Sequence, residues 1–361
     1  MKITHEILEL RTRHAFHIAR AAGAPVRRNV WLRVHADDGA EGWGEAAANA
    51  YYGETADTVT ALLPLYEQAL TDAAGSEQGA EQAPGHADDG GPDPLALERA
   101  ERAVELAAGS NPAARAAISA ALHDLAGKRL GVPVWKLWGL DDAATPLSSY
   151  TLGIDSPDAM RAKLDEASSY PILKLKVGTA EDRRMLELVR AAAPDKPIRV
   201  DANTAWDAKQ ALALVPLLEE LDIEFIEQPF KADDIAAFRM LRDRTRIPVI
   251  ADESCRTTSD IPRLVGAVDG INIKLEKCGS LREAVRMVHV ARAHHLKVMV
   301  GCMMCSTLAV AAAVQLAPLC DWADLDGAAL MANDPFSGPG LEADGRLRLN
   351  TEPGLGVTRA G

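Results

Sequence analysis

Short apolar runs recur at nearly even intervals over the second half of the chain. Their polar or small ends fall at positions 176, 201, 227, 252, 274, 301 and 324, so the steps between neighbours are 25, 26, 25, 22, 27 and 23 residues. The predicted strands cover residues 149–152, 172–177, 198–201, 223–227, 248–252, 271–274, 298–301 and 322–326.

Segments with helical periodicity fill the gaps between these runs. Ser156-Pro157 combines a capping residue with a proline at the first helical position. Ser280 to Glu283 has the form of a capping box, followed by an apolar stripe of Val285, Val288 and Val290. Strands and helices alternating at this spacing predict parallel βα units, and eight strands close a barrel. An open doubly wound sheet is less favoured, because no Gly-x-Gly-x-x-Gly turn follows a strand.

The first 125 residues have a different pattern. Runs at 30–35 and 41–46 flank Asp37-Asp38-Gly39, which predicts an antiparallel hairpin. Residues 20–25 are rich in Gly and Pro and predict a mobile loop, whereas 95–108 and 112–129 read as helices. Residues 71–94 contain no Val, Ile, Leu, Met or aromatic side chain, which predicts a disordered insertion. We therefore expect an α+β domain over 1–125, a barrel over 126–330, and a segment 331–361 that packs back on the first domain.

Composition narrows the classes of function. With 39 basic and 52 acidic residues, the net charge of −13 disfavours binding to nucleic acid or to anionic membranes. No apolar run reaches the ~20 residues of a membrane span, and the N-terminus lacks a signal-peptide pattern. The five cysteines are odd in number and scattered, so we expect a reducing, cytoplasmic setting without disulfides.

Three carboxylates end consecutive predicted strands: Asp201, Glu227 and Asp252. In a barrel, functional side chains gather where the strands end. Each acid alone could cap a helix, but three at equivalent positions repel one another unless a cation neutralises them. Oxygen donors without His or Cys favour Mg²⁺, with Mn²⁺ as an alternative.

Lysines form a second group. Lys174 and Lys176 share one face of the second strand, and Lys274 ends the sixth strand, diametrically opposite in an eight-stranded barrel. Two amines on opposite sides of a metal-bound substrate suit proton removal from one face of a carbon and return to the other. The metal would stabilise the enolate of a substrate carboxylate. We expect desolvation and neighbouring positive charge to lower the pKa of the lysine base, while Lys174 could serve only to balance charge.

These motifs resemble those of the enolase superfamily, within it the muconate lactonizing enzyme subgroup. The resemblance spans nearly the whole chain and rests on Lys174-x-Lys176, Asp201-Ala202-Asn203, Glu227-Gln228-Pro229, Ala251-Asp252-Glu253 and Lys274-x-x-Lys277-x-Gly279. It implies a capping domain over a modified (β/α)₇β TIM-type barrel. It also implies a metal at Asp201, Glu227 and Asp252, and acid/base chemistry by Lys176 and Lys274.

The eighth strand favours one reaction within that family. Asp324 and Asp326 share a face of the strand. We expect this pair to lie far around the barrel from the metal cluster and to attract an ammonium group at the distal end of the substrate. A ligand with a carboxylate at the metal and a distant ammonium is most simply a dipeptide. Asp324-Leu325-Asp326-Gly327 is similar to the signature of dipeptide epimerases. The resemblance therefore implies Mg²⁺-dependent epimerisation at the α-carbon of the C-terminal residue.

Alternatives remain open. N-acylamino acid racemases and o-succinylbenzoate synthases act on substrates without that ammonium, and a catalytically inactive metal- and peptide-binding protein is a third alternative. Sugar-acid dehydratases are disfavoured, because the seventh strand ends without a His, and His294 and His295 precede it.

We also expect Thr151, Met303 and Cys305 to contact the substrate. Met304-Cys305-Ser306 departs from the Met-Glu-Ser usual in dipeptide epimerases, which alters the pocket wall. Cys302 and Cys305 have redox spacing, but without a thioredoxin-like setting a pocket-lining role is favoured.

Specificity is expected from loops near residues 17–28 and 51–55 that close over the barrel. Arg20, Arg27 or Arg28 could reach an acidic second side chain, as in Ala-Glu, or remain solvated surface charges. The expected partner is a small-molecule dipeptide, and we expect a homo-oligomer.

Overall fold

The second half of the chain forms a closed parallel barrel. The computed structural model describes residues 1–75 and 96–360. Its eight strands are β6 (Tyr150–Leu152), β7 (Leu173–Lys176), β8 (Ile198–Asp201), β9 (Ile223–Glu227), β10 (Val249–Ala251), β11 (Gly270–Ile273), β12 (Lys297–Gly301) and β13 (Trp322–Asp324). A parallel bridge between Ser148 and Ala323 joins the first strand to the last and closes the barrel.

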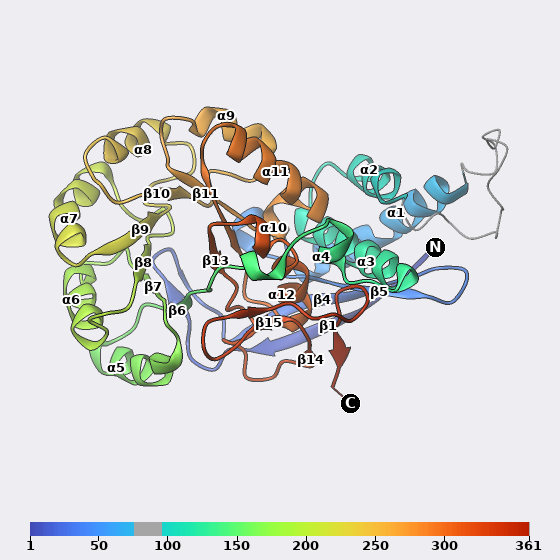
Figure 1. The fold of residues 1–361 in the computed structure, drawn as a ribbon, viewed down its shortest axis with the longest axis horizontal. Helices are drawn as coiled ribbons and strands as arrows, with labels where there is room; N and C mark the ends of the chain where they lie inside the picture. The colour runs from blue at the N-terminus through green and yellow to red at the C-terminus, as the bar shows by residue number, and fades with distance from the viewer. Residues whose placement is uncertain (76–95, 361) are drawn as a thin grey trace.

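Helices cover the outside of this barrel (Figure 1). They are α5 (Pro157–Glu166), α6 (Asp182–Ala192), α7 (Ala208–Glu220), α8 (Ile235–Arg242), α9 (Ile261–Leu264), α11 (Leu281–Ala293) and α12 (Thr307–Val314), with a short α10 (Leu275–Cys278) between β11 and α11. After β13 the chain passes directly into the C-terminal segment. The predicted modified (β/α)₇β barrel is therefore confirmed.

The N-terminal domain packs a helix against an antiparallel sheet. The sheet has the order β1 (Lys2–Arg11), β4 (Val26–His35), β5 (Glu41–Ala46), and the helices are α1 (Ala56–Gly75), α2 (Leu97–Ala107) and α3 (Pro112–Leu130). A Cβ added at Gly42 or Gly44 would lie within 2 Å of a carbonyl oxygen of α3. Glycine is therefore required for this close approach of helix and sheet.

Several boundaries differ from the predictions. Residues 71–75 belong to α1, and 76–94 of the predicted insertion lie outside the described residues. Within the predicted loop 20–25, β3 (Ala21–Ala22) pairs with β2 (His17–Ile18), because two backbone pairs suffice for a small hairpin. The predicted domain boundary at 125 falls inside α3, which continues to Leu130 and is followed by α4 (Val134–Leu137).

The start of α11 keeps only half of the predicted capping box. The Ser280 hydroxyl accepts a hydrogen bond from the Glu283 amide at 2.9 Å, but the Glu283 carboxylate accepts from Thr258 instead. Val285 and Val290 are only partly buried, because the helix presents a neighbouring stripe to the barrel. That buried stripe consists of Leu281, Ala284, Met287, Val288 and Ala291.

The C-terminal segment returns to the first domain, as predicted. It forms two small ladders, β14 (Phe336–Ser337) with β17 (Thr358–Arg359) and β15 (Gly340–Leu341) with β16 (Leu347–Arg348). The ring of Phe336 packs edge-on against Trp31, with centroids 5.4 Å apart. Arg359 forms an ion pair with Glu6 at 2.8 Å.

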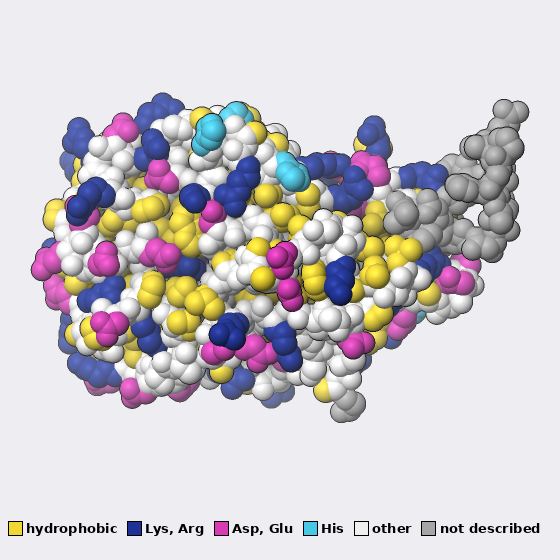
Figure 2. All heavy atoms as spheres, viewed as in Figure 1, with side chains coloured by type: hydrophobic (Ala, Val, Ile, Leu, Met, Phe, Trp, Pro, Cys, Tyr) yellow, Lys and Arg dark blue, Asp and Glu magenta, His cyan; other side chains and the backbone are white. Residues whose placement is uncertain are grey.

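The surface mixes both signs of charge. Basic and acidic side chains are interspersed over the face in Figure 2. No described helix combines the length and the apolar character needed to cross a bilayer.

Candidate active site at the mouth of the barrel

A cavity of about 570 Å³ lies at the mouth of the barrel, where both domains contribute walls. Its lining residues come from the β2–β3 hairpin, from the segment after β5, and from the carboxyl ends of the barrel strands. Lys176 and Lys274 line it together with Asp252, Asp324 and Asp326. The structure thus brings most of the predicted site residues to one cavity.

The three predicted metal ligands lie side by side. Asp201 and Glu227 end the paired strands β8 and β9 in direct register, and Asp252 follows β10. All three side chains are buried. Burial and the negative charge of Asp201 raise the pKa of Glu227 to about 7.

Lys174 binds carboxylates from three strands. Its Nζ lies 2.6 Å from Glu227 Oε2, 2.6 Å from Asp324 Oδ2 and 3.4 Å from Asp201 Oδ2. It is fully buried and belongs to the wall behind the cavity lining. Asp324 is therefore linked to the acidic cluster through one ammonium group, which corrects the expectation that it lies far from the cluster.

The other two lysines each hold a different acid. Lys176 donates a hydrogen bond to Asp201 at 2.5 Å, and Lys274 donates one to Asp252 at 2.7 Å. In the circular strand order, three strands separate β7 from β11 in either direction. Lys176 and Lys274 thus approach the cavity from opposite sides, as predicted.

Ion pairs control the pKa of two of the lysines. Burial by itself lowers the pKa of Lys274, but the carboxylates of Asp252 and Glu227 outweigh it and raise the pKa. The pKa of Lys174 is raised in the same way, by Asp324, Glu227 and Asp201 against the effect of burial. The lowering expected for the lysine base beside Lys174 and a bound metal stays a prediction.

Asp324 and Asp326 are both buried, and they differ in their partners. Asp324 accepts a hydrogen bond from Ser149 Oγ at 2.7 Å besides its contact with Lys174. Asp326 accepts one from the Thr151 amide at 2.6 Å. Burial and the nearby Asp324 raise the pKa of Asp326 to about 6. A cation arriving in the cavity would relieve this repulsion.

Of the three other residues predicted to contact the substrate, two line the cavity and one does not. Thr151 and Met303 line the cavity. Cys305 does not: its side chain is fully buried behind the wall, and Cys302 and Met304 take the cavity side instead. The prediction for Cys305 is wrong, because the chain turns between β12 and α12 and points its side chain inward.

Two buried polar residues support the acids without having been assigned a role from sequence. Lys277 lies 2.6 Å from Asp252 Oδ1 and donates to the carbonyls of Asp252, Cys255 and Asn272. Asn272 donates to Glu227 at 2.8 Å. Lys277 was visible as a motif lysine, but only its contacts in the structure show that it joins the loop after β10 to β11.

The cap hairpin reaches into the site through Arg20. Its guanidinium donates to the Asn203 carbonyl at 2.9 Å, pairs with the buried Glu253, and stacks on Tyr51 at 4.0 Å. Arg28 pairs with Asp57 on the surface and does not line the cavity.

Arg27 also lines the cavity. Burial lowers the pKa of its guanidinium, and its buried Nε has no hydrogen-bond partner among the described residues.

The acidic cluster fits a hard divalent cation by its donors. Oε2 of Glu227 and Oδ1 of Asp252 are buried, and each lies 2.6 Å from an ammonium group, that of Lys174 and of Lys277 respectively. Over residues 1–75 and 96–360, no three acidic, His or Cys side chains already converge as a ligand set. Lysines separate these carboxylates, so a cation would exchange with an ammonium contact.

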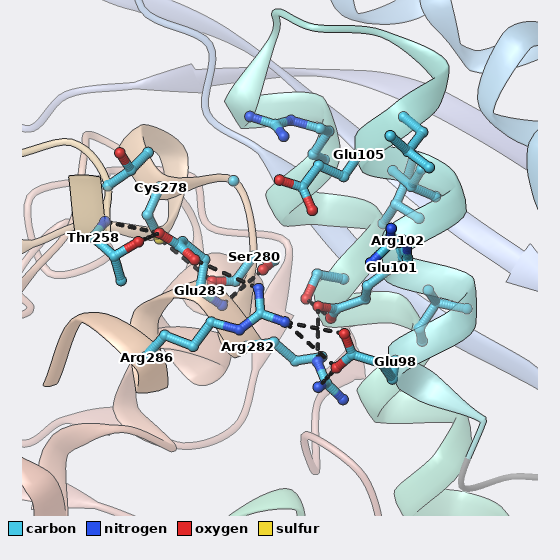
Figure 3. Close-up of a pocket in the computed structure, with 18 of the residues that line it drawn as sticks. Glu98, Glu101, Arg102, Glu105, Thr258, Cys278, Ser280, Arg282, Glu283 and Arg286 are labelled. Carbon is cyan, nitrogen blue, oxygen red and sulfur yellow. Dashed lines mark hydrogen bonds and ion pairs between the residues drawn. The ribbon is translucent and has the colours of Figure 1, made fainter. Parts of the chain in front are cut away.

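A second cavity, of about 780 Å³, lies between α2 and α11 and holds ion pairs between the two domains (Figure 3). Glu98 pairs with Arg282 and Arg286, and Arg286 also lies 3.6 Å from Glu283. These contacts link the cap to the barrel.

Comparison with known proteins agrees with this geometry. A family model described as enolase C-terminal domain-like matches residues 158–360, more than half of the chain. The chain belongs to the enolase superfamily. A second model, for the N-terminal domain of mandelate racemase and muconate lactonizing enzyme, matches residues 91–139. The family resemblance seen in the sequence is thereby confirmed.

Named members of the superfamily are similar over almost the whole chain. An L-Ala-D/L-Glu epimerase from Bacteroides thetaiotaomicron is 39% identical, covering 99% of this chain and 88% of its own. The dipeptide epimerase of Enterococcus faecalis, solved with Mg and L-Leu-L-Tyr, has a TM-score of 0.87 at 28% identity, covering 99% and 98% of the two chains. An N-succinyl Arg/Lys racemase from Bacillus cereus has a TM-score of 0.86 at 29% identity, covering 100% and 96%.

Proposed function

We propose that this chain is a Mg²⁺-dependent dipeptide epimerase that inverts the α-carbon of the C-terminal residue. The observation that carries the proposal is the pair Lys176 and Lys274, which line one cavity from opposite sides of the barrel. A 1,1-proton transfer needs one acid/base group on each face of the carbon. The similarity to epimerases named for dipeptides supports this reading.

The lysines carry out the proton transfers. One neutral amine accepts the α-proton, and the opposite ammonium returns a proton to the other face. A divalent cation bound by Asp201, Glu227 and Asp252 would polarise the substrate carboxylate. It would replace lysine ammonium groups as the partner of these carboxylate oxygens. Lys174 stays buried behind the site and balances the charge of Asp324 and Glu227.

The aspartates select a dipeptide over an N-acyl amino acid. Asp326 holds no ion pair with a lysine in the described part of the chain, and its charge is disfavoured beside Asp324. An α-ammonium placed there gains a charge-assisted hydrogen bond. An N-succinyl group would bring a carboxylate to the same place and be repelled.

Arg27 favours an acidic second side chain. It lines the same cavity as the lysines, and its guanidinium is partly buried with an unsatisfied Nε. Arg20 is already neutralised by Glu253. We therefore assign Arg27 to a carboxylate on the C-terminal residue, as in Ala-Glu. In Arg27→Met, KM for L-Ala-L-Glu should rise about tenfold or more, while KM for L-Ala-L-Leu changes little.

Isotope exchange tests the proposal. The protein is incubated in D₂O with Mg²⁺ and a dipeptide library, and deuterium at the C-terminal α-carbon is read by mass spectrometry. We expect exchange with inversion, abolished in Lys176→Ala and Lys274→Ala, with one-sided exchange of a single epimer as the only remaining activity. Asp326→Asn should raise KM for the dipeptide by roughly 10- to 100-fold.

Other outcomes point to the alternatives. Exchange into N-succinyl or N-acetyl amino acids without exchange into dipeptides would identify an acylamino acid racemase. Dipeptide binding without any exchange would identify a binding protein. Full inversion by both lysine variants would contradict the two-base mechanism.

A further inference from the structure

Two thiols meet in the wall of the active-site cavity. The sulfurs of Cys302 and Cys305 both lie beside Gly327. A Cβ added at Gly327 would lie 2.9 Å from each sulfur, so both occupy the space that this glycine leaves open. Both cysteines are free thiols.

Their surroundings give the two thiols different accessibility. Cys302 is partly exposed and lines the cavity, and its sulfur accepts a hydrogen bond from the Gly327 amide at 3.3 Å. Cys305 is fully buried behind it. Cys302 Sγ also donates to the Asp324 carbonyl at 3.6 Å. Of the two thiols, the accessible one meets a dissolved oxidant first. This is the arrangement of an attacking cysteine with a buried resolving partner.

We propose that Cys302 and Cys305 form an oxidation site at which a hydroperoxide converts the dithiol to a disulfide and thereby weakens substrate binding. The effect on turnover rests on the proposed epimerase function, whereas the oxidation site does not.

The chemistry balances with hydrogen peroxide as oxidant. The Cys302 thiolate attacks one peroxide oxygen, an S–O bond forms as the O–O bond breaks, and the released hydroxide takes up a proton to give water. Cys305 then attacks the Cys302 sulfur, the S–S bond forms, and the S–O oxygen leaves as a second water with the second thiol proton. In sum, two thiols and one peroxide give one disulfide and two waters.

Oxidation would disturb the substrate wall through Gly327 and Met303. Gly327 directly follows Asp326, and a Cβ added at this glycine would lie 2.5 Å from the Met303 carbonyl, which shows how tightly the two segments pack. Met303 also accepts a hydrogen bond from Asn49 of the cap through its sulfur. Drawing the two cysteines into a disulfide therefore moves the loop against which Asp326 is set.

The test maps the bond and measures its effect on the full-length protein. After treatment with hydrogen peroxide, the protein is unfolded in guanidinium chloride so that buried thiols become accessible. Remaining thiols are then blocked with N-ethylmaleimide, and the digest is analysed by mass spectrometry. We expect Cys302 and Cys305 to be unlabelled and about 2 Da lighter as a pair, while Cys320 on the same tryptic peptide is labelled. KM for the dipeptide should rise about tenfold and return with dithiothreitol, which distinguishes a disulfide from methionine sulfoxide.

Variants separate the contributions. Cys305→Ala should retain the unoxidised KM and lose the dithiothreitol-reversible response, whereas Cys320→Ala should respond like the parent protein. Labelling of both thiols after peroxide, or over-oxidation of Cys302 without a disulfide, would overturn the assignment. A mapped disulfide with unchanged KM would overturn the effect on binding. If the chain turns over no dipeptide, the mapping still decides whether the disulfide forms. The absence of turnover then contradicts the proposed epimerase function and not the oxidation site.

Discussion

Lys174 is a single buried charge that contacts three carboxylates. It touches acids from β8, β9 and β13, strands far apart in sequence, and none of these contacts is exposed to water. A buried ion pair stabilises little relative to an apolar substitute, but losing one partner leaves the others uncompensated. Lys174 is therefore a structural requirement for the acidic cluster as well as part of the site.

Replacing Lys174 tests this point. Lys174→Met should lower the free energy of unfolding by about 3–5 kcal/mol in the absence of metal, because Glu227 and Asp324 lose their counter-charge. Mg²⁺ should restore part of the loss, since it binds the folded state. The measurement is urea unfolding with EDTA or Mg²⁺, and Lys209→Met, at an exposed position, is the matched control. Equal stability of the two variants in EDTA would contradict the assignment.

At the scale of elements, the β2–β3 hairpin is connected to the acidic cluster by a single side chain. Arg20 connects it to Asn203 and Glu253, each one or two residues beyond an acid of the cluster. The hairpin over the cavity and the acidic cluster beneath it are thus joined by one side chain. A change in the cluster should reach the hairpin through this contact.

Loss of Arg20 should loosen the hairpin. In Arg20→Met we expect hydrogen exchange of residues 16–24 to quicken about tenfold and KM to rise several-fold, because one charge-assisted contact and one stacking contact are lost. Arg20→Lys should give exchange rates and KM values between those of the parent and Arg20→Met, since an amine cannot reproduce the planar set of donors of a guanidinium. Arg28→Met, whose ion pair is on the surface, is the control. Unchanged exchange in Arg20→Met would show that the hairpin is held elsewhere.

Glu54 links the segment after β5 to the start of α3. It accepts a hydrogen bond from the Ala113 amide at 3.1 Å, and its other oxygen is buried without a partner. Burial raises the pKa of Glu54 from 4.5 to about 7. Because the folded state holds the proton more tightly, the stabilisation is complete below pH 4.5 and is lost as the pH rises through 7.

The pH dependence of stability should therefore change in Glu54→Gln. The parent protein should lose about 1 kcal/mol more than the variant between pH 6 and pH 8, the scale of one pKa unit. Urea unfolding at both values measures the difference, and Glu181→Gln, on the surface, should behave like the parent. If the free energy of unfolding depends on pH in the same way in the parent and in Glu54→Gln, titration of Glu54 is not the cause of the loss.

At the scale of the whole molecule, the two domains and the C-terminal segment share one apolar core. Trp31 of the cap, Phe336 of the C-terminal segment and Val300 of β12 belong to the same cluster of buried residues. The cap sheet has its own smaller core against α3. We therefore expect the domains to unfold together rather than in separate steps.

Phe336→Ala tests this coupling. Removing a buried ring that contacts Trp31 and Trp43 should cost about 3–5 kcal/mol. Circular dichroism and tryptophan fluorescence should report one coincident transition in the parent and in the variant. Separate transitions would show that the C-terminal segment does not join the domains.

Much of this protein follows from local pattern. The barrel strands, the caps at Ser156 and Ser280, and the acids at Asp201, Glu227 and Asp252 are all visible as short-range signals, because strand ends and helix starts depend on neighbouring residues. The hairpin β2–β3 and the end of α1 were not, since two backbone pairs or one polar turn leave no periodic signal.

What the sequence determined by itself is the order of elements and the chemistry at each strand end, because both are properties of residues close along the chain. Only the tertiary structure decided which charges meet. Lys174 contacts Asp324 across 150 residues, Arg20 reaches Glu253 across 233, and Cys305 turns away from the cavity that Cys302 faces. Such contacts depend on barrel closure and on the seating of the cap, and these bring together groups whose distance along the chain carries no information about their distance in space.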